Sequence, residues 1–183
     1  MRNGLSPAST GTHSATVLTL SAVTQGSFDP RAIKAGHFAV EPPTDKRVNR
    51  QDFMMCRGNG NRSLVGIGTY SHEDRPDLVF PDTVIAGRVD TSLVDMAFLE
   101  AAWRQRAVRS QIEAVARTTN GTFKVNQQTL SAITVSVPPL ELQYAFADRV
   151  ARTLARRHTV QQALAADDEL FASLQSRAFR GEL

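Results

Sequence analysis

Hydrophobic positions follow two different periods along the chain. Up to about residue 90 they form short apolar or β-branched runs separated by Gly, Pro and Asn, a pattern typical of strands joined by turns. The runs that predict strands are residues 15–23, 53–56, 63–70 and 78–89, the last one divided or kinked by Pro81. The loop 57–62 carries Gly and Asn suited to a turn, so we expect it to join two strands as a hairpin with a cationic tip.

From residue 92 the apolar positions recur every three or four residues instead. Over 92–117 this spacing, opened by Thr91 or Ser92 as N-cap, predicts two consecutive helices or one bent helix. The residues 118–121 then stop the helical pattern. After them we expect a short helical turn at 127–130, capped by Asn126, and a strand at 133–137 before the two prolines at 138 and 139.

The last forty residues predict one long helix. Residues 140–179 contain no Gly or Pro and are rich in Ala, Leu, Gln, Arg and Glu, which are good helix formers. Steps of four and three residues mark a stripe in which seven of ten positions are apolar: Phe146, Val150, Thr153, Arg157, Val160, Leu164, Asp167, Phe171, Leu174 and Ala178. A helix of this length spans about 60 Å, and one small domain cannot cover so long a stripe. We therefore expect a partner helix, although the helix could instead fold back on its own domain.

These patterns predict an α+β protein. A mainly β globular domain with a few helices would occupy residues 1–137, and a long coiled-coil helix would follow at 138–183. A hydrophobic content of 42% is enough to build a core. Because there is neither a long apolar run nor an apolar leader, we expect a cytoplasmic protein. The single Cys56 cannot form an internal disulfide, and four scattered histidines do not make a metal cluster with it.

Motifs for catalysis are missing from the sequence. Nothing matches an ATP phosphate-binding loop or a dinucleotide-binding loop. The pair Pro138-Pro139 lacks the Asn or Asp before it and the aromatic residue after it that amino-methyltransferases use. Acidic residues in the extended segments lack the Glu-x-Lys of a two-metal nuclease. We expect Cys56 to be a buried structural residue rather than a nucleophile, because no histidine is near it in sequence.

Positive charge is concentrated in the first part of the chain. Residues 1–137 hold 15 basic and 12 acidic side chains, whereas 138–183 hold six of each. The 18 Arg far outnumber the 3 Lys, which suits bidentate contacts to phosphate and guanine. One candidate surface for DNA combines five cations with two asparagines: Lys46, Arg47, Arg50, Arg57, Asn59, Asn61 and Arg62. An ordinary solvated hairpin tip would have the same composition.

A second candidate surface lies after the helical region. Residues 117–128 carry hydroxyls, amides and two cations, Arg117 and Lys124, on a loop at a helix end. The candidate contacts on it are Thr118, Thr119, Asn120, Lys124, Asn126 and Gln127. Taken alone, this stretch could equally be a capped connection between two elements.

Two segments resemble the specificity subunits of type I restriction-modification systems. Gly121-Thr122-Phe123-Lys124-Val125-Asn126 through Leu130, followed by Ile133, Pro138-Pro139-Leu140, Glu141 and Gln143, is similar to the junction between a target-recognition domain and the conserved helix of that family. The ending from Leu170 to Leu183 resembles the C-terminal signature of the family, and Cys56-Arg57-Gly58-Asn59-Gly60 resembles its Arg-Gly-Asn hairpin.

The resemblance implies a non-catalytic subunit that reads double-stranded DNA and directs its partners to a bipartite site. Partner modification subunits would methylate adenine with S-adenosylmethionine, and restriction subunits would use ATP and Mg²⁺, so this chain itself would bind no cofactor. One recognition domain with one helix would make it a half-subunit that homodimerises through the helix, or a fragment. The alternatives are an interaction adaptor that no longer reads DNA and, least favoured, a self-contained DNA-modifying enzyme.

Overall fold

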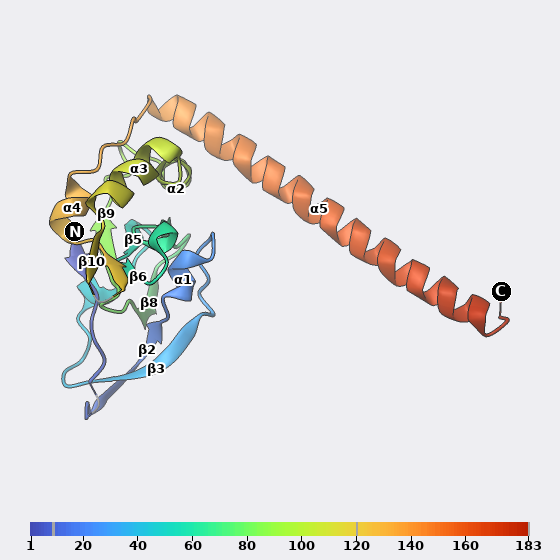
Figure 1. Cartoon of the computed structure of the whole chain (residues 1–183), viewed down its shortest axis with the longest axis horizontal. Helices are drawn as coiled ribbons and strands as arrows, with labels where there is room; N and C mark the ends of the chain where they lie inside the picture. The colour runs from blue at the N-terminus through green and yellow to red at the C-terminus, as the bar shows by residue number, and fades with distance from the viewer. Residues whose placement is uncertain (9, 120, 183) are drawn as a thin grey trace. The chain divides into compact units, whose positions relative to one another are not determined.

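Strand β5 (Asp52–Cys56) lies at the centre of the globular domain, and all five of its residues are buried. In the computed structural model, residues 1–8, 10–119 and 121–182 are described, without the side chain of Thr119. Two units divide the chain, Met1–Leu140 and Glu141–Leu183. The first is a mixture of sheets and short helices and the second is a single helix (Figure 1), as the α+β prediction requires.

The first sheet surrounds β5 and is antiparallel throughout. Its strands have the order β1-β9-β5-β7, with β1 at Arg2–Asn3, β9 at Val84–Arg88 and β7 at Gly68–Tyr70. Alternate residues of β5 belong to two separate clusters, because Phe53 and Met55 pack with Trp103 while Met54 packs with Leu18 and Phe80. The sheet is therefore covered on both faces, which explains why β5 is continuously apolar after Asp52.

The second sheet covers one of these faces. Its order is β3-β2-β8-β4, with β3 at Ile33–Phe38, β2 at His13–Leu18, β8 at Arg75–Val79 and β4 at Arg47–Val48. The expected strand at 15–23 was too long, since β2 ends at Leu18 and the short helix α1 (Ser21–Thr24) follows. Ala22 and Val23 of α1 are fully buried. A buried helical turn and a buried strand give the same apolar run, so the sequence could not separate them.

Two helices cover the other face of the first sheet. They are α2 (Met96–Trp103) and α3 (Arg106–Val115), which confirms the helical spacing over 92–117. The N-cap is Asp95, whose Oδ1 accepts a hydrogen bond from Phe98 N at 2.8 Å, and not Thr91 or Ser92 as expected. Ser92 belongs to the preceding turn, because its backbone N and its Oγ both donate to Asp90.

The expected strand at 63–70 is reduced to its last three residues. A 3₁₀ turn, η2 (Arg62–Leu64), follows Asn61, which accepts a hydrogen bond from Ser63 N. Gly66 then has a φ of 67°, and a Cβ on it would lie 2.5 Å from Cγ2 of Ile112. The chain can turn here because only glycine combines this conformation with such close packing of α3. Trp103 Nε1 donates to the carbonyl of Gly66 at 2.7 Å and closes the turn.

The segment before the prolines contains one expected element and lacks another. Helix α4 (Gln127–Ser131) begins after Asn126, whose side chain and Thr129 form a capping box. The strand expected at 133–137 is not present. Instead the backbone of Thr134 pairs with a side chain: Gln111 Oε1 accepts from Thr134 N and Gln111 Nε2 donates to Thr134 O, both at 3.0 Å. The side-chain amide of Gln111 therefore makes the two backbone hydrogen bonds that a neighbouring strand would otherwise make.

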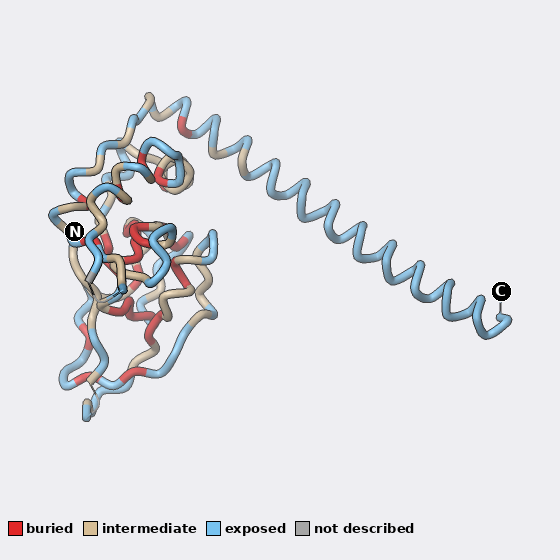
Figure 2. Tube along the Cα trace, in the orientation of Figure 1, coloured by how far each residue is buried: buried red, intermediate tan, exposed pale blue. Residues whose placement is uncertain are grey.

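Helix α5 (Leu140–Phe179) has the predicted bounds. Every residue from 151 to 182 is exposed in the chain as it stands, as the uniform colour of this stretch in Figure 2 shows. Large apolar side chains are among the exposed ones: the exposed fractions of Val160, Leu164 and Phe171 are 66%, 59% and 68%. Within the described residues, no helix is both long and apolar enough to cross a membrane.

Candidate nucleic-acid interface

A small third sheet joins the two surfaces that the sequence suggested separately. Its order is β10-β11-β6, with β10 at Arg117–Thr119, β11 at Thr122–Lys124 and β6 at Gly58–Asn59. Lys124 lies opposite Gly58, and Phe123 lies opposite Asn59. Val125 N also donates to the carbonyl of Arg57 at 2.9 Å. The loop after β5 and the hairpin after α3 therefore form one continuous surface.

Alternation along β11 decides which side chains face outward. Phe123 packs against the main core, and the Arg62 guanidinium lies 5.9 Å from the centre of its ring. Lys124 points to the opposite face and is exposed. Arg117 lies directly opposite Lys124 on β10, so the two cations share that face.

Like charges directly across a strand pair repel each other. Among the described residues, neither Arg117 nor Lys124 has an acidic partner within ion-pair distance, and both are exposed. An anion bound between them would relieve the repulsion. This arrangement is unfavourable for the isolated fold and suited to binding a phosphate.

A pocket of about 330 Å³ opens beside this pair of cations. Its lining consists of Arg57, Gly58, Asp82, Thr83, Thr122 and Lys124. The guanidinium of Arg57 donates to the backbone carbonyl of Asp82 at 3.3 Å, which holds it at the rim. A Cβ on Gly58 would lie 3.1 Å from Cγ of Lys124, so glycine leaves this side of the pocket open.

The chemistry of the lining suits a nucleic acid. Two cations can contact backbone phosphates, two threonine hydroxyls can donate or accept, and one carboxylate can accept from an exocyclic amine. The same mixture would be a poor site for an apolar ligand.

The asparagines of the 57–62 loop shape it while leaving donors exposed. Asn59 Oδ1 accepts from Asn61 N at 2.9 Å, and Asn61 Oδ1 accepts from Ser63 N at 3.0 Å. Their amide nitrogens have no protein partner in the described part of the chain. Arg62 donates to the carbonyl of Glu113 at 2.8 Å, which ties the end of the loop to α3. The two asparagines thus fix the loop through their side-chain carbonyl oxygens, and their side-chain amide N–H groups remain available.

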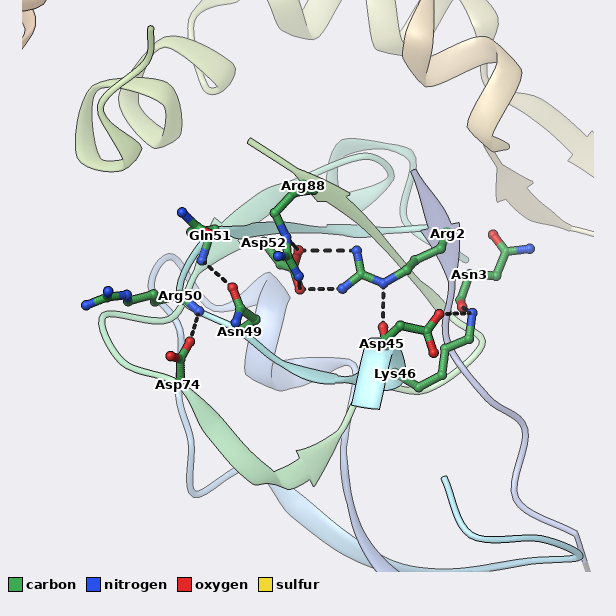
Figure 3. A network of polar contacts seen from close by, with 10 residues as sticks. All are labelled: Arg2, Asn3, Asp45, Lys46, Asn49, Arg50, Gln51, Asp52, Asp74 and Arg88. Atoms are coloured by element: carbon green, nitrogen blue, oxygen red, sulfur yellow. Dashed lines mark hydrogen bonds and ion pairs between the residues drawn. The ribbon is translucent and has the colours of Figure 1, made fainter. Parts of the chain in front are cut away.

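The other cations of the predicted cluster do not line this pocket, and Figure 3 shows two of them, Lys46 and Arg50, with their neighbours. Lys46 Nζ donates to the carbonyl of Asn3 at 2.9 Å. The Arg47 guanidinium is used within the domain, where it bonds to Pro42 O, Pro76 O and Glu41. The run 46–62 is therefore not one surface, because the buried strand β5 separates its two ends. The side chain of Arg50 is exposed beside a different hollow, of about 240 Å³, that Tyr70 and His72 also line.

The remaining predicted contact residues are distributed around the third sheet. Thr118 is exposed on β10, and Thr119 ends that strand. Asn120 lies outside the described residues. The carbonyl of the Asn126 side chain caps α4, and Gln127 Nε2 donates to Asn3 Oδ1 at 3.2 Å. For these residues, DNA contact stays a prediction.

Sequence reasoning missed Asp82 and Thr83, and it placed Arg117 and Thr122 within the second candidate surface without singling them out as contacts. The register of a hairpin turning at Gly121, which has a φ of 74°, could have placed Arg117 opposite Lys124. Nothing in the sequence indicates Asp82 and Thr83, because they reach the pocket only through the pairing of β9 with β5.

No histidine or cysteine is among the described residues that line this pocket. Cys56 is buried, as expected, and burial raises the pKa of its thiol to about 11, which keeps it protonated at neutral pH. The part of the chain that the structure describes contains no group of three or more His, Cys, Asp or Glu arranged to hold a metal ion.

Comparisons with known proteins find relatives of one kind. The chain is 26% identical over 190 residues to the type I restriction enzyme EcoKI specificity subunit of Escherichia coli (strain K12), a match that covers 100% of this chain and 40% of that protein. It is 26% identical over 141 residues to the StySPI specificity subunit of Salmonella potsdam, covering 74% of this chain and 30% of that protein. The chain thus spans less than half the length of these relatives. No protein-family model matches it.

A solved structure supports the fold. The HsdS subunit of Thermoanaerobacter tengcongensis superposes with a TM-score of 0.59 at 16% identity, covering 82% of this chain and 38% of that one.

Proposed function

Because the chain is related along its whole length to the specificity subunits of type I restriction enzymes, we propose that it is a non-catalytic, sequence-specific binder of double-stranded DNA. The observation that carries the proposal is the surface of the third sheet. It presents the opposed cations Arg117 and Lys124 beside a pocket that contains Arg57. Phosphate contacts from these cations would position the domain, and exposed amides of the 57–62 loop would contact base edges.

The rest of the proposed role concerns partners. In this proposal the chain directs an adenine-N6 methyltransferase subunit and, indirectly, a restriction subunit to a bipartite site. S-adenosylmethionine, ATP and Mg²⁺ would be bound by those subunits and not by this chain. The exposed helix α5 supports the proposal, because it offers a long surface on which a second copy and a modification subunit can dock.

Binding to a labelled duplex at several salt concentrations tests the DNA surface. The duplex would first be selected from a random pool, with and without a modification subunit. Replacing Arg57, Arg117 or Lys124 by Ala should each weaken binding about tenfold. Each replacement should also lower the slope of log K against log salt concentration by about 0.9, since one phosphate contact is lost.

Lys34→Ala is the matched control, because it removes one exposed cation from β3 in the second sheet. Its affinity and salt slope should equal those of the parent chain. If the three variants also bind like the parent, the third sheet is not the DNA surface. If selection recovers no preferred sequence, the chain is an interaction adaptor instead.

A further inference from the structure

One acidic side chain, that of Asp82, is among the described residues that line the pocket beside the third sheet. The cations of Arg57 and Lys124 line the same pocket. Within the described part of the chain, the carboxylate of Asp82 forms no ion pair and no hydrogen bond, because the contact with Arg57 is made by the backbone carbonyl of Asp82. The carboxylate therefore neither neutralises these cations nor ties elements of the fold together.

The backbone that carries this carboxylate is held from two sides. Asp82 N donates to the carbonyl of Leu5 at 3.1 Å, and Arg57 N donates to the carbonyl of Thr83 at 2.8 Å. The guanidinium of Arg57 adds its bond to the carbonyl of Asp82 at 3.3 Å. These bonds fix the turn at 82–83, so its two side chains start from a constant position. A fixed position is what reading a base through a hydrogen bond requires.

A carboxylate on a DNA-binding surface has an electrostatic cost. It repels the phosphate backbone, which the neighbouring cations Arg117 and Lys124 would attract. Asp82 can offset this cost by accepting a hydrogen bond from a group that phosphates lack. The N–H donors on the edges of the bases are such groups, and they differ from base to base.

The donors and acceptors in the major groove decide which base suits a carboxylate. An ionised carboxylate accepts hydrogen bonds and donates none. Cytosine presents its N4 amino donor alone, whereas adenine presents the N6 donor beside the N7 acceptor. Guanine presents the acceptors N7 and O6, and thymine presents the acceptor O4. A carboxylate therefore favours cytosine, fits adenine less well and is repelled by guanine and thymine.

We propose that Asp82 reads a cytosine in the major groove by accepting a hydrogen bond from its N4 amino group, while Arg57 and Lys124 contact phosphates beside it. The inference rests on the proposed function and adds to it the residue that discriminates one base pair and the base that it selects. Within one pocket the cations then supply affinity and the carboxylate supplies selectivity.

Selection from a random duplex pool, carried out with the parent chain and with Asp82→Asn, tests the inference. Asn has nearly the size of Asp, but its amide both donates and accepts, which suits N6 and N7 of adenine. One C·G pair of the sequence that the parent selects should therefore become an A·T pair with the variant. The other positions should stay as they were. The same selected sequence for parent and variant would refute the inference.

Competition binding measures the change as a ratio of affinities. The parent should bind its selected duplex about tenfold more tightly than the same duplex with thymine in place of that cytosine. For Asp82→Asn this ratio should fall below about threefold. The variant should also bind an unrelated duplex at least as tightly as the parent, since one repulsive charge is removed. Weaker binding of the variant to every duplex would mean that Asp82 maintains the shape of the domain, and would overturn the inference.

Two further variants separate base reading from charge. Lys124→Ala should weaken binding to all duplexes and leave the selected sequence unchanged, as the loss of a phosphate contact does. Asp77→Asn is the matched control, because it removes an exposed negative charge from β8 in the second sheet. Its selected sequence should equal that of the parent. If Asp77→Asn changes the sequence in the same way as Asp82→Asn, net charge is the cause and the inference fails.

A base analogue distinguishes the two grooves. Replacing the guanine paired with the selected cytosine by hypoxanthine removes an amino group from the minor groove and keeps cytosine N4 in the major groove. The affinity of the parent should stay within about threefold, whereas a loss of about tenfold would place the contact in the minor groove and overturn the inference.

The outcomes also separate this inference from the proposed function. A parent chain that enriches no sequence would refute sequence-specific DNA binding, and the role of Asp82 with it. A parent that enriches a sequence which Asp82→Asn leaves unchanged would refute the role of Asp82 alone.

Discussion

Asp52 is the acidic residue that holds the N-terminus of the domain to its central sheet. Its side chain is fully buried, and its carboxylate accepts hydrogen bonds from the guanidinium groups of Arg2 and Arg88 (Figure 3). Arg2 also lies 5.4 Å from the centre of the Phe80 ring. In the sequence Asp52 was only the single acid within a basic run. In the structure its two arginine partners come from β1 and β9, both of which lie outside that basic run in the sequence.

Replacing Asp52 by Ala should destabilise the domain by about 3–5 kcal/mol, since it leaves Arg2 without its buried counter-charge. Urea unfolding followed by tryptophan fluorescence measures this, because Trp103 is buried in the core. Asp77→Ala is the matched control: Asp77 makes a similar two-bond contact with Arg75, but at an exposed site. If both replacements change the unfolding midpoint equally, burial is not the reason for the effect of Asp52.

Cys56 should make the free energy of unfolding fall as the pH rises in the alkaline range. Burial raises the pKa of its thiol from 9.0 to about 11 in the folded chain, so the unfolded chain releases this proton first. The contribution of the neutral thiol to stability is complete below pH 9 and is lost as the pH rises from 9 to 11. The loss amounts to about 1.4 kcal/mol for each pKa unit.

A Cys56→Ala variant lacks this contribution, so its free energy of unfolding should fall less than that of the parent between pH 9 and 11. Urea titrations at four or five pH values in this range measure the two slopes. Tyr70, whose pKa burial raises to about 12, is present in both chains and cancels in the comparison. Parallel slopes for parent and variant would contradict the prediction.

At the scale of elements, the sequence predicted best where a local signal was enough. The bounds of α5 follow from forty residues without Gly or Pro, and the start of α4 follows from the capping side chain of Asn126. The central strand β5 follows from a short buried run. These elements depend on residues close in sequence, so no knowledge of the fold is needed to find them.

Elements that depend on distant residues were predicted poorly. The run at 133–137 has strand composition, but Gln111 of α3 bonds to its backbone where a strand would have to lie. The candidate site shows the same limit. Arg57 and Lys124 were both predicted contacts. They lie close together only because β6 pairs with β11, and these two strands are more than sixty residues apart in the sequence. Lys46 is close to Arg57 in sequence and is held by Asn3 instead.

At the scale of the whole molecule, the two units should differ in how their stability depends on concentration. The domain has buried clusters of its own, whereas α5 is exposed from 151 onward, and the contacts described there lie within the helix itself: backbone hydrogen bonds and local side-chain pairs such as Arg152–Asp148. If a second copy covers α5, the backbone amides of α5 should exchange their hydrogens with solvent mainly while the chain is a monomer. The monomer fraction of a tight dimer varies with the inverse square root of the total concentration.

Hydrogen exchange followed by mass spectrometry measures this difference directly. A hundredfold dilution of the dimer should raise the exchange rates of amides in 151–179 about tenfold, while those of β5 stay constant. Leu164→Asp should show the fast rates already at the higher concentration, because a charge at an apolar position of the stripe weakens any dimer that covers it. The contrary result is a chain that sediments as a monomer and whose helix amides stay protected on dilution. It would mean that α5 is stable alone and that its exposed stripe needs no partner.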